Sequence, residues 1–238
     1  MKEDNNKAGT LTPAGLWGKL GAGGADLRLA FWCLMLAGGF AYVSGVLCGR
    51  KMPFTSGAGY GDFFWLLATA PVLYALGPRH TLEPFENGSR ALWWNFLGFA
   101  FPFFIALHFF YLQRIPNLNY SITPSDLARI TPMAAAVFTG TAVLILVLGA
   151  CHLRMAHKEG ILLPYASAFL GSILLIAAIT WAIRADYAFH IHHYFLFGFF
   201  VPFTRFRNPI SLVFQALCAG IYVEGVSEWS MSLLWDLK

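Results

Sequence analysis

"MAAAVFTGTAVLILVLGACHL", residues 133–153, is a run of 21 residues without a charged side chain. At about 1.5 Å of rise per residue, such a run covers a hydrocarbon core of about 30 Å when it is helical. The rest of the chain is similar, because 58% of its residues are hydrophobic and only 12% are charged. Soluble domains carry about twice that charged fraction. The sequence therefore predicts an integral membrane protein of the all-α class.

Six further apolar runs accompany this one, at residues 29–48, 63–77, 91–112, 161–183, 187–204 and 209–226. The first of them is longer than a signal-peptide core of about 7–15 residues, so we expect an uncleaved helix there. The run at 63–77 is short and contains Pro71, and six helices are the alternative if it does not span. We expect a polytopic transmembrane bundle of about seven helices, as one domain over residues 29–238 after a flexible polar tail over residues 1–28.

The last two runs are separated by a turn that contains Arg205 and Arg207. An arginine at the bilayer midplane costs several kcal/mol, so this turn should lie at a membrane surface and the two runs should form an antiparallel hairpin. With seven helices, ten of the sixteen Lys and Arg residues fall on the side of the N-terminal tail. The positive-inside rule then predicts a cytosolic N-terminus and a C-terminus on the opposite side.

Composition also limits the classes of molecule that the chain is expected to bind. The net charge of +4 is spread over the loops, and no basic run interleaved with aromatic residues indicates a nucleic-acid surface. Membrane lipids are the expected neighbours, and other membrane subunits are a further class of partner. The four cysteines lie in or beside apolar runs without CxxC spacing, which is typical of buried small hydrophobic residues.

The histidines fall into two clusters, His152 with His157 and His190 with His192 and His193. Together they are reminiscent of the histidine boxes of membrane desaturases. However, the clusters should lie at opposite ends of the run at 161–183, about 35 Å apart, and the HxHH spacing differs from HxxHH. We therefore expect them not to form one metal centre.

The hairpin brings other residues together. Reflection about the Arg207–Asn208 turn places Glu224 level with position 191, within one helical turn of His190 and His193. Residues three apart share a helix face, so His190 and His193 should point the same way and His192 elsewhere. His108, Asp62, Asp186 and Glu228 should lie on the same membrane side. The sequence thus predicts a histidine and carboxylate cluster at one membrane face.

Such a cluster permits three interpretations. It can lock the hairpin by hydrogen bonds, or it can handle protons or ions, because histidine titrates near neutrality. Both belong to a membrane protein of unassigned activity. The alternative is a metal-dependent enzyme acting on lipid or another membrane-soluble substrate. Its ligands would be His190, His193 and His108, its metal Zn or Fe, and its catalytic residue Glu224 as a further ligand or general base. Whether the chain is an enzyme stays open.

Residues 190–230, HIHHYFLFGFFVPFTRFRNPISLVFQALCAGIYVEGVSEWS, also resemble the C-terminal membrane region of fungal LCCL-domain proteins. The matching positions include His192, His193, Tyr194, Gln215 and Trp229. The similarity covers roughly a fifth of the chain, and the Cys-rich LCCL domain itself is not part of it. The resemblance implies a unit made of the last two helices and implies no reaction.

Overall fold

The part of the chain that the structure describes folds almost entirely into helices. The computed structural model describes residues 24–48, 57–83, 89–115, 128–189, 192–231 and 234–237. The long helices within these residues are α2 Gly24–Tyr42, α3 Gly57–Leu76, α5 Ser89–Ala106, α7 Pro132–Lys158, α8 Leu162–Ile183 and α10 Pro209–Trp229. The short elements are η1 Val43–Leu47, α4 Pro78–Thr81, η2 Phe109–Arg114, β1 Tyr187–Phe189, α9 His193–Phe200, η3 Val201–Thr204 and β2 Trp235–Leu237. The predicted all-α fold is confirmed.

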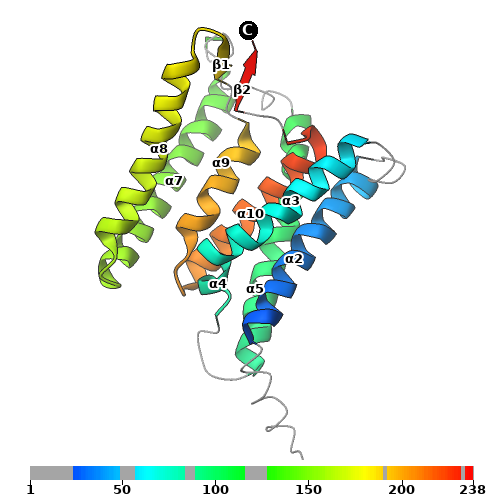
Figure 1. Cartoon of the computed structure of the whole chain (residues 1–238), viewed down its shortest axis with the longest axis vertical. Coiled ribbons are helices and arrows are strands. Elements are labelled where there is room, and N and C mark those ends of the chain that lie inside the picture. Colours follow the sequence, from blue (N-terminus) through cyan, green and yellow to red (C-terminus); the bar gives the residue numbers. More distant parts are fainter. Residues whose placement is uncertain are drawn as a thin grey trace, which may run out of the picture.

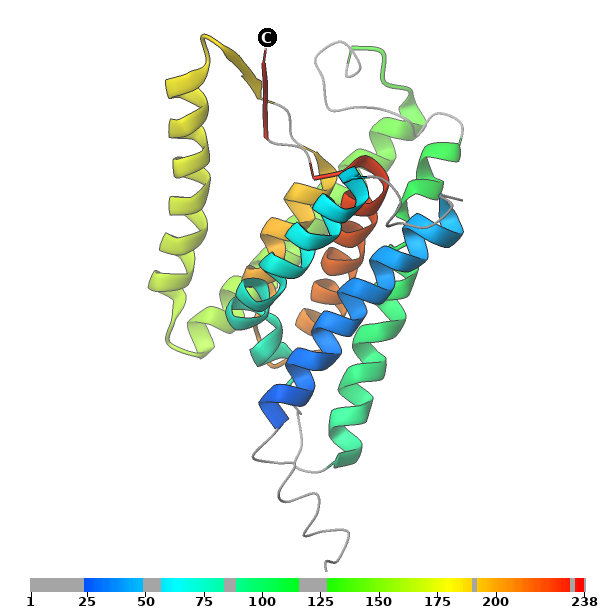
Figure 2. The same ribbon diagram turned by 45° about the vertical axis from the view of Figure 1, so that its right-hand side comes forward.

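Five helical segments are long and apolar enough to cross a membrane: Leu27–Leu47, Arg90–Leu112, Pro132–Lys158, Leu162–Ile183 and Pro209–Trp229. Two shorter apolar helices, Tyr60–Leu76 and His193–Thr204, accompany them. In Figures 1 and 2, all of these segments run between the same two ends of the molecule, and neighbours in the chain run in opposite directions. The chain therefore has the helices of an integral membrane protein.

Helix α10 lies at the centre of the bundle (Figure 1) and packs against α2, α3, α5 and α9. Fourteen of its residues are buried, on every side of the helix. A helix that is apolar all round finds its place in the interior, whereas a one-sided helix lies at a surface. Gly220 makes this packing possible, because a Cβ there would overlap the backbone carbonyl of Phe103 on α5. Anything polar on α10 is consequently held inside the protein.

The predicted hairpin of the last two runs is present. Asn208 caps the N-terminus of α10, since its side-chain oxygen accepts a hydrogen bond from the backbone N–H of Ile210 at 2.9 Å. Pro209 occupies the first helical position, where no intrahelical N–H is needed. The close approach of α9 to α10 depends on Gly198, which packs against the ring of Tyr222. The hairpin turn thus follows from local sequence signals.

Helices α7 and α8 form a second hairpin on the outside of the bundle, where α8 stands apart in Figure 2. Helix α8 has no buried residue, and only 6% of the most apolar part of α7 is buried. Two hydrogen bonds attach one end of this hairpin to the core. Ser211 donates to Nε2 of His152 at 3.0 Å, and the Tyr165 hydroxyl donates to the carbonyl oxygen of Phe203 at 2.7 Å. Most of the hairpin surface is left for lipid.

Two predicted boundaries are wrong. The helix expected over residues 187–204 begins only at His193, because residues 187–189 form β1 and pair antiparallel with β2, with Phe189 opposite Trp235. The predicted tail over residues 1–28 extends too far, because α2 begins at Gly24; residues 1–23 lie outside the described residues. Because of the first difference, α9 begins at His193, and His193 is the residue that contacts Glu224.

Contacts between segments far apart in the sequence define the two ends of the bundle. At the arginine end (Arg28, Arg79 and Arg205), the Arg28 side chain donates to the Arg79 carbonyl at 3.3 Å. At the carboxylate end (Asp62, Glu224 and Glu228), Oδ1 of Asp62 accepts from the backbone N–H of Met231 at 2.9 Å. These contacts bring Arg28 to Arg79 at one end and Asp62 to Met231 at the other; the predicted membrane sides of the loops stay a prediction.

Candidate functional site

The site is centred on Glu224, a buried carboxylate at the carboxylate end of the bundle. It lies in the last third of α10, and its side chain is 0% exposed. One carboxylate oxygen, Oε2, lies 3.2 Å from Nε2 of His193. The other, Oε1, has no hydrogen-bond partner among the described residues. A buried carboxylate costs several kcal/mol unless it is paired or protonated, so this half-satisfied group needs a physical explanation.

His193 is the first residue of α9 and reaches the carboxylate from the neighbouring helix. Gly225, beside Glu224, carries no side chain, and the Tyr194 side chain occupies the space that a Cβ there would take. This contact brings the start of α9 against the end of α10. The His193 side chain is 29% exposed, whereas that of Glu224 is not exposed at all. The histidine therefore connects the buried carboxylate with the outside of the protein.

A π-helical turn, η1, lies beside this part of α10. Such turns are rare and often occur at functional sites. Cys48, just after η1, contacts the carboxylate of Glu228 through its sulfur. Ser44 precedes Cys48 by one turn, as Glu224 precedes Glu228, so Ser44 and Glu224 lie at similar depths. The Ser44 hydroxyl is buried, and no described residue accepts or donates a hydrogen bond to it. A second buried polar atom without a described partner thus lies at a similar depth in the bundle.

The predicted contact between Glu224 and the histidines is confirmed for His193. His190 lies outside the described residues, so its predicted role stays a prediction. The ring of His192 stacks on that of Tyr194, with centroids 5.3 Å apart. We expected His190 and His193 to share one face of a helix. Because α9 begins at His193, position 190 is not part of the described helix.

His108 lies at the same end of the bundle but faces other partners. Its Nδ1 donates to the carbonyl oxygen of Phe104 at 2.9 Å, and its Nε2 accepts from the Tyr42 hydroxyl at 3.1 Å. Its neighbour Phe109 is the residue that packs on the His193 ring, with centroids 5.4 Å apart. Within the described part of the chain, no three His, Cys, Asp or Glu side chains are grouped as a metal ion would need. The predicted ligands His108 and His193 are therefore not members of such a group among the described residues.

The other histidine cluster is distant from this site, as expected. His152 contacts Ser211, and His193 contacts Glu224, thirteen residues further along the same helix. That separation corresponds to about 20 Å along α10. The ring of His152 also packs between those of Phe206 and Phe214. His152 is a satisfied core histidine, and it does not share a coordination sphere with His193.

Several polar contacts could not be named from the sequence. They are Ser211 with His152, Tyr42 with His108, Cys48 with Glu228, and Arg205 with His80. In each contact, at least one of the polar residues lies within or at the end of an apolar run, which indicates that it needs a partner. The identity of that partner depends on how the helices pack.

Comparison of the chain with protein-family models, with curated proteins and with solved structures found no match. The resemblance of residues 190–230 to the membrane region of LCCL-domain proteins stays an expectation.

Proposed function

We propose that this chain is a polytopic membrane protein whose His193–Glu224 pair takes up and releases a proton at one end of the helix bundle. The observation that supports this function is the state of Glu224. It is fully buried, holds His193 with one oxygen at 3.2 Å, and has no partner for the other among the described residues. A carboxylate placed only to lock two helices together would have both oxygens satisfied.

The chemistry of the pair follows from its charge. With neutral His193 and ionised Glu224, the pair carries one negative charge in a region of low dielectric. In this form, neutral His193 donates from Nε2 to Oε2 of Glu224 across the 3.2 Å contact. Uptake of one proton at Nδ1, the other ring nitrogen of His193, makes the pair neutral overall. The Nε2 proton can then stay on His193 or move to Oε2 of Glu224 without movement of either helix. Release through the partly exposed His193 restores the charged form.

The described surroundings of the pair contain a second carboxylate and uncharged rings. Glu228 lies one turn further along α10, and its carboxylate contacts Cys48. The uncharged rings of Phe109 and Tyr194 lie beside His193.

Infrared spectroscopy of the purified protein in detergent tests this function. A protonated buried carboxylic acid has a carbonyl stretching band that a carboxylate lacks. We expect that band to grow as the pH is lowered, and to be missing from the Glu224→Gln variant, which keeps the side-chain shape. His193→Gln should shift the pH at which the band appears. His157→Gln is the matched control, because His157 is exposed on α7.

The structural alternative makes a different prediction. If the pair only holds α9 against α10, Glu224→Gln and His193→Gln lower the melting temperature, and the infrared titration is the same as that of the wild type. In that case the proton-handling function is wrong, and the pair is a lock between two helices.

A further inference from the structure

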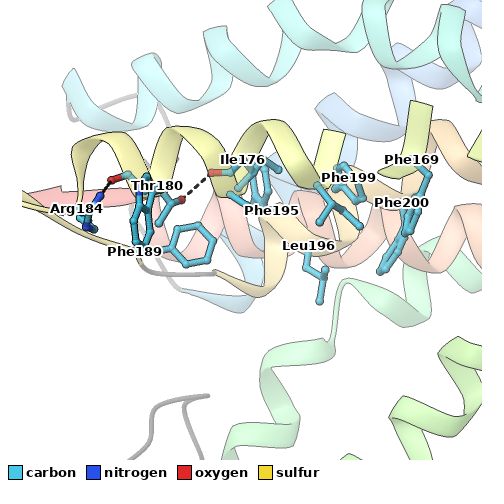
Figure 3. A pocket seen from close by; sticks show the side chains of 12 residues that line it. Phe169, Ile176, Thr180, Arg184, Phe189, Phe195, Leu196, Phe199 and Phe200 are labelled. Atoms are coloured by element: carbon cyan, nitrogen blue, oxygen red, sulfur yellow. Dashed lines mark hydrogen bonds between the residues drawn. The ribbon is translucent and has the colours of Figure 1, made fainter. Parts of the chain in front are cut away.

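An apolar groove lies between α8 and α9, on the side of α9 that faces away from Glu224. It encloses a cavity of about 520 Å³. Figure 3 shows Phe169, Phe199 and Phe200 at one end and Arg184, Thr180 and Phe189 at the other. Phe195 and Leu196 line its middle part. The volume is within the range of about 300–1,000 Å³ that is usual for small-molecule sites.

The groove follows from the two faces of α9. Tyr194 and Gly198, one turn apart, pack against α10, whereas Phe195 and Phe199 lie about 100° further round α9 and line the groove. Helix α8 forms the other wall without burying any of its residues. Because α8 is also apolar and long enough to cross a membrane, the groove opens into the hydrocarbon region. The molecules that surround such an opening in a membrane are the acyl chains of lipids.

One end of the groove is polar. The guanidinium of Arg184 stacks on the Trp181 ring at 3.7 Å from its centroid and donates to the Trp181 carbonyl at 2.6 Å. Arg184 follows directly after α8, at the carboxylate end of the bundle, where arginine and tryptophan side chains lie at the level of lipid headgroups. The side chain is exposed, and a guanidinium has five N–H donors in a geometry that matches phosphate.

The dimensions agree with a lipid. From Phe169 to Arg184, the groove follows fifteen residues of α8, a rise of about 22 Å. One leaflet contributes half of a hydrocarbon core of about 30 Å, that is about 15 Å. The groove is therefore long enough for one acyl chain and for the connection between that chain and a phosphate at Arg184.

We propose that this groove binds an anionic phospholipid, with one acyl chain between α8 and α9 and the phosphate at Arg184. The near absence of polar groups along the walls favours the acyl chain, and Arg184 at one end of the groove favours a negatively charged headgroup. This site is separate from the His193–Glu224 pair, and the proposal does not depend on the proton-handling function.

Native mass spectrometry of the full-length protein tests the proposal, with phosphatidylglycerol and phosphatidylcholine of identical chains added in equal amounts. We expect the wild type to retain phosphatidylglycerol with a preference of about tenfold, the effect of one strong charge-assisted contact. Ala177→Trp fills the groove and should abolish retention of both lipids. Ala178→Trp, at the same depth on α8 but outside the groove, is the matched control and should bind as the wild type does. Arg184→Gln should keep one lipid but lose the preference.

Three results would overturn the proposal. Equal binding of the two lipids by the wild type contradicts the role of Arg184. Equal effects of Ala177→Trp and Ala178→Trp mean that the lipid lies elsewhere. A change of oligomeric mass in Ala177→Trp, with lipid retention unchanged, would make the groove an interface between copies of the chain.

Discussion

The arginine end and the carboxylate end of the bundle each contain a histidine with an ionisable partner, and the two partners have opposite charges. At the arginine end, the Arg205 side chain donates to Nε2 of His80 at 3.0 Å. At the carboxylate end, Nε2 of His193 lies 3.2 Å from Oε2 of Glu224. His80 must be neutral to accept from a guanidinium, whereas His193 can carry a proton beside a carboxylate. The charge of the neighbour therefore decides which histidine can exchange protons in place.

The same helix supplies the polar groups of both regions. Near the arginine end, Nε2 of Gln215 donates to the carbonyl oxygens of Val201 and Thr204, at 3.0 and 3.1 Å. Two and a half turns later, α10 carries Glu224. The amide of Gln215 can donate hydrogen bonds to the two carbonyl oxygens beside it. The carboxylate of Glu224 can accept a hydrogen bond from the histidine beside it. The two side chains differ by one functional group, and exchanging that group is the sharpest way to test the comparison.

Gln215→Glu should have the largest effect. It replaces the donating nitrogen by an oxygen that faces two carbonyl oxygens in a fully buried position. An unpaired buried charge costs about 3–5 kcal/mol, so we expect a loss of about 4 kcal/mol in the free energy of unfolding at neutral pH. Acidification should restore part of the lost stability, because a protonated carboxyl group can donate a hydrogen bond to one of the two carbonyl oxygens. Denaturant unfolding in detergent at two pH values measures this, and Gln215→Leu is the control without pH dependence. An unchanged stability would remove the proposed difference between the ends.

Gly225→Val should have the next largest effect, at the carboxylate end. The added side chain overlaps with Tyr194, so the start of α9 must move away from α10 and His193 must leave Glu224. Overpacking of this kind costs about 1–3 kcal/mol. Gly171→Val on α8 is the control, because a Cβ there meets nothing within 4 Å. Thermal unfolding of both variants provides the comparison, and equal melting temperatures would contradict the close packing of α9 on α10.

Much of this arrangement follows from local signals, and the rest depends on contacts between distant segments. The long apolar runs gave the helices, and the surface position of the Arg205–Arg207 turn gave the register that brings Glu224 to His193. The pairing of Tyr187–Phe189 with Trp235–Leu237 was not predicted, because nothing near residue 187 indicates a partner almost fifty residues away. The actual start of α9 was missed for the same reason.

The site shows the same division. His108 was placed at the correct end of the bundle, but its side chain turns to Tyr42, which lies on a helix whose rotation no periodicity in the sequence reveals. The unpartnered oxygens of Glu224 and Ser44 are also visible only when the packing is known. Sequence patterns locate polar groups along a helix, and packing decides which of them meet.

Ser211→Ala tests the attachment of the outer hairpin and should have a moderate effect. The hydroxyl of Ser211 donates to Nε2 of the buried His152, whose Nδ1 donates to the Leu148 carbonyl at 2.6 Å. Loss of that donor leaves a buried acceptor unsatisfied, at a cost of about 1–2 kcal/mol. Hydrogen exchange should become faster in α7 near His152. Ser172→Ala is the control, because the Ser172 hydroxyl bonds only within its own helix. Equal exchange in the two variants would show that this contact does not hold α7.

The smallest effect concerns the pH dependence of the arginine end. Partial burial, together with Arg205 and Arg79, lowers the pKa of His80 from its ordinary value of 6.5; Arg28 acts in the same direction, and Glu83 opposes it. Above about pH 7.5, His80 is neutral in the folded and unfolded protein and contributes no pH dependence. As the pH falls from about 7.5 through the lowered pKa of the folded state, the unfolded chain binds more protons, so stability decreases. His80→Gln, whose amide oxygen can still accept from Arg205, should remove this part of the slope between about pH 7.5 and about pH 5. Melting temperatures of both proteins over this range measure the difference, and added salt should reduce it by screening the arginines. A steeper slope in His80→Gln than in the wild type would mean that His80 is stabilised in its charged form, and the contrast between the two ends would be lost.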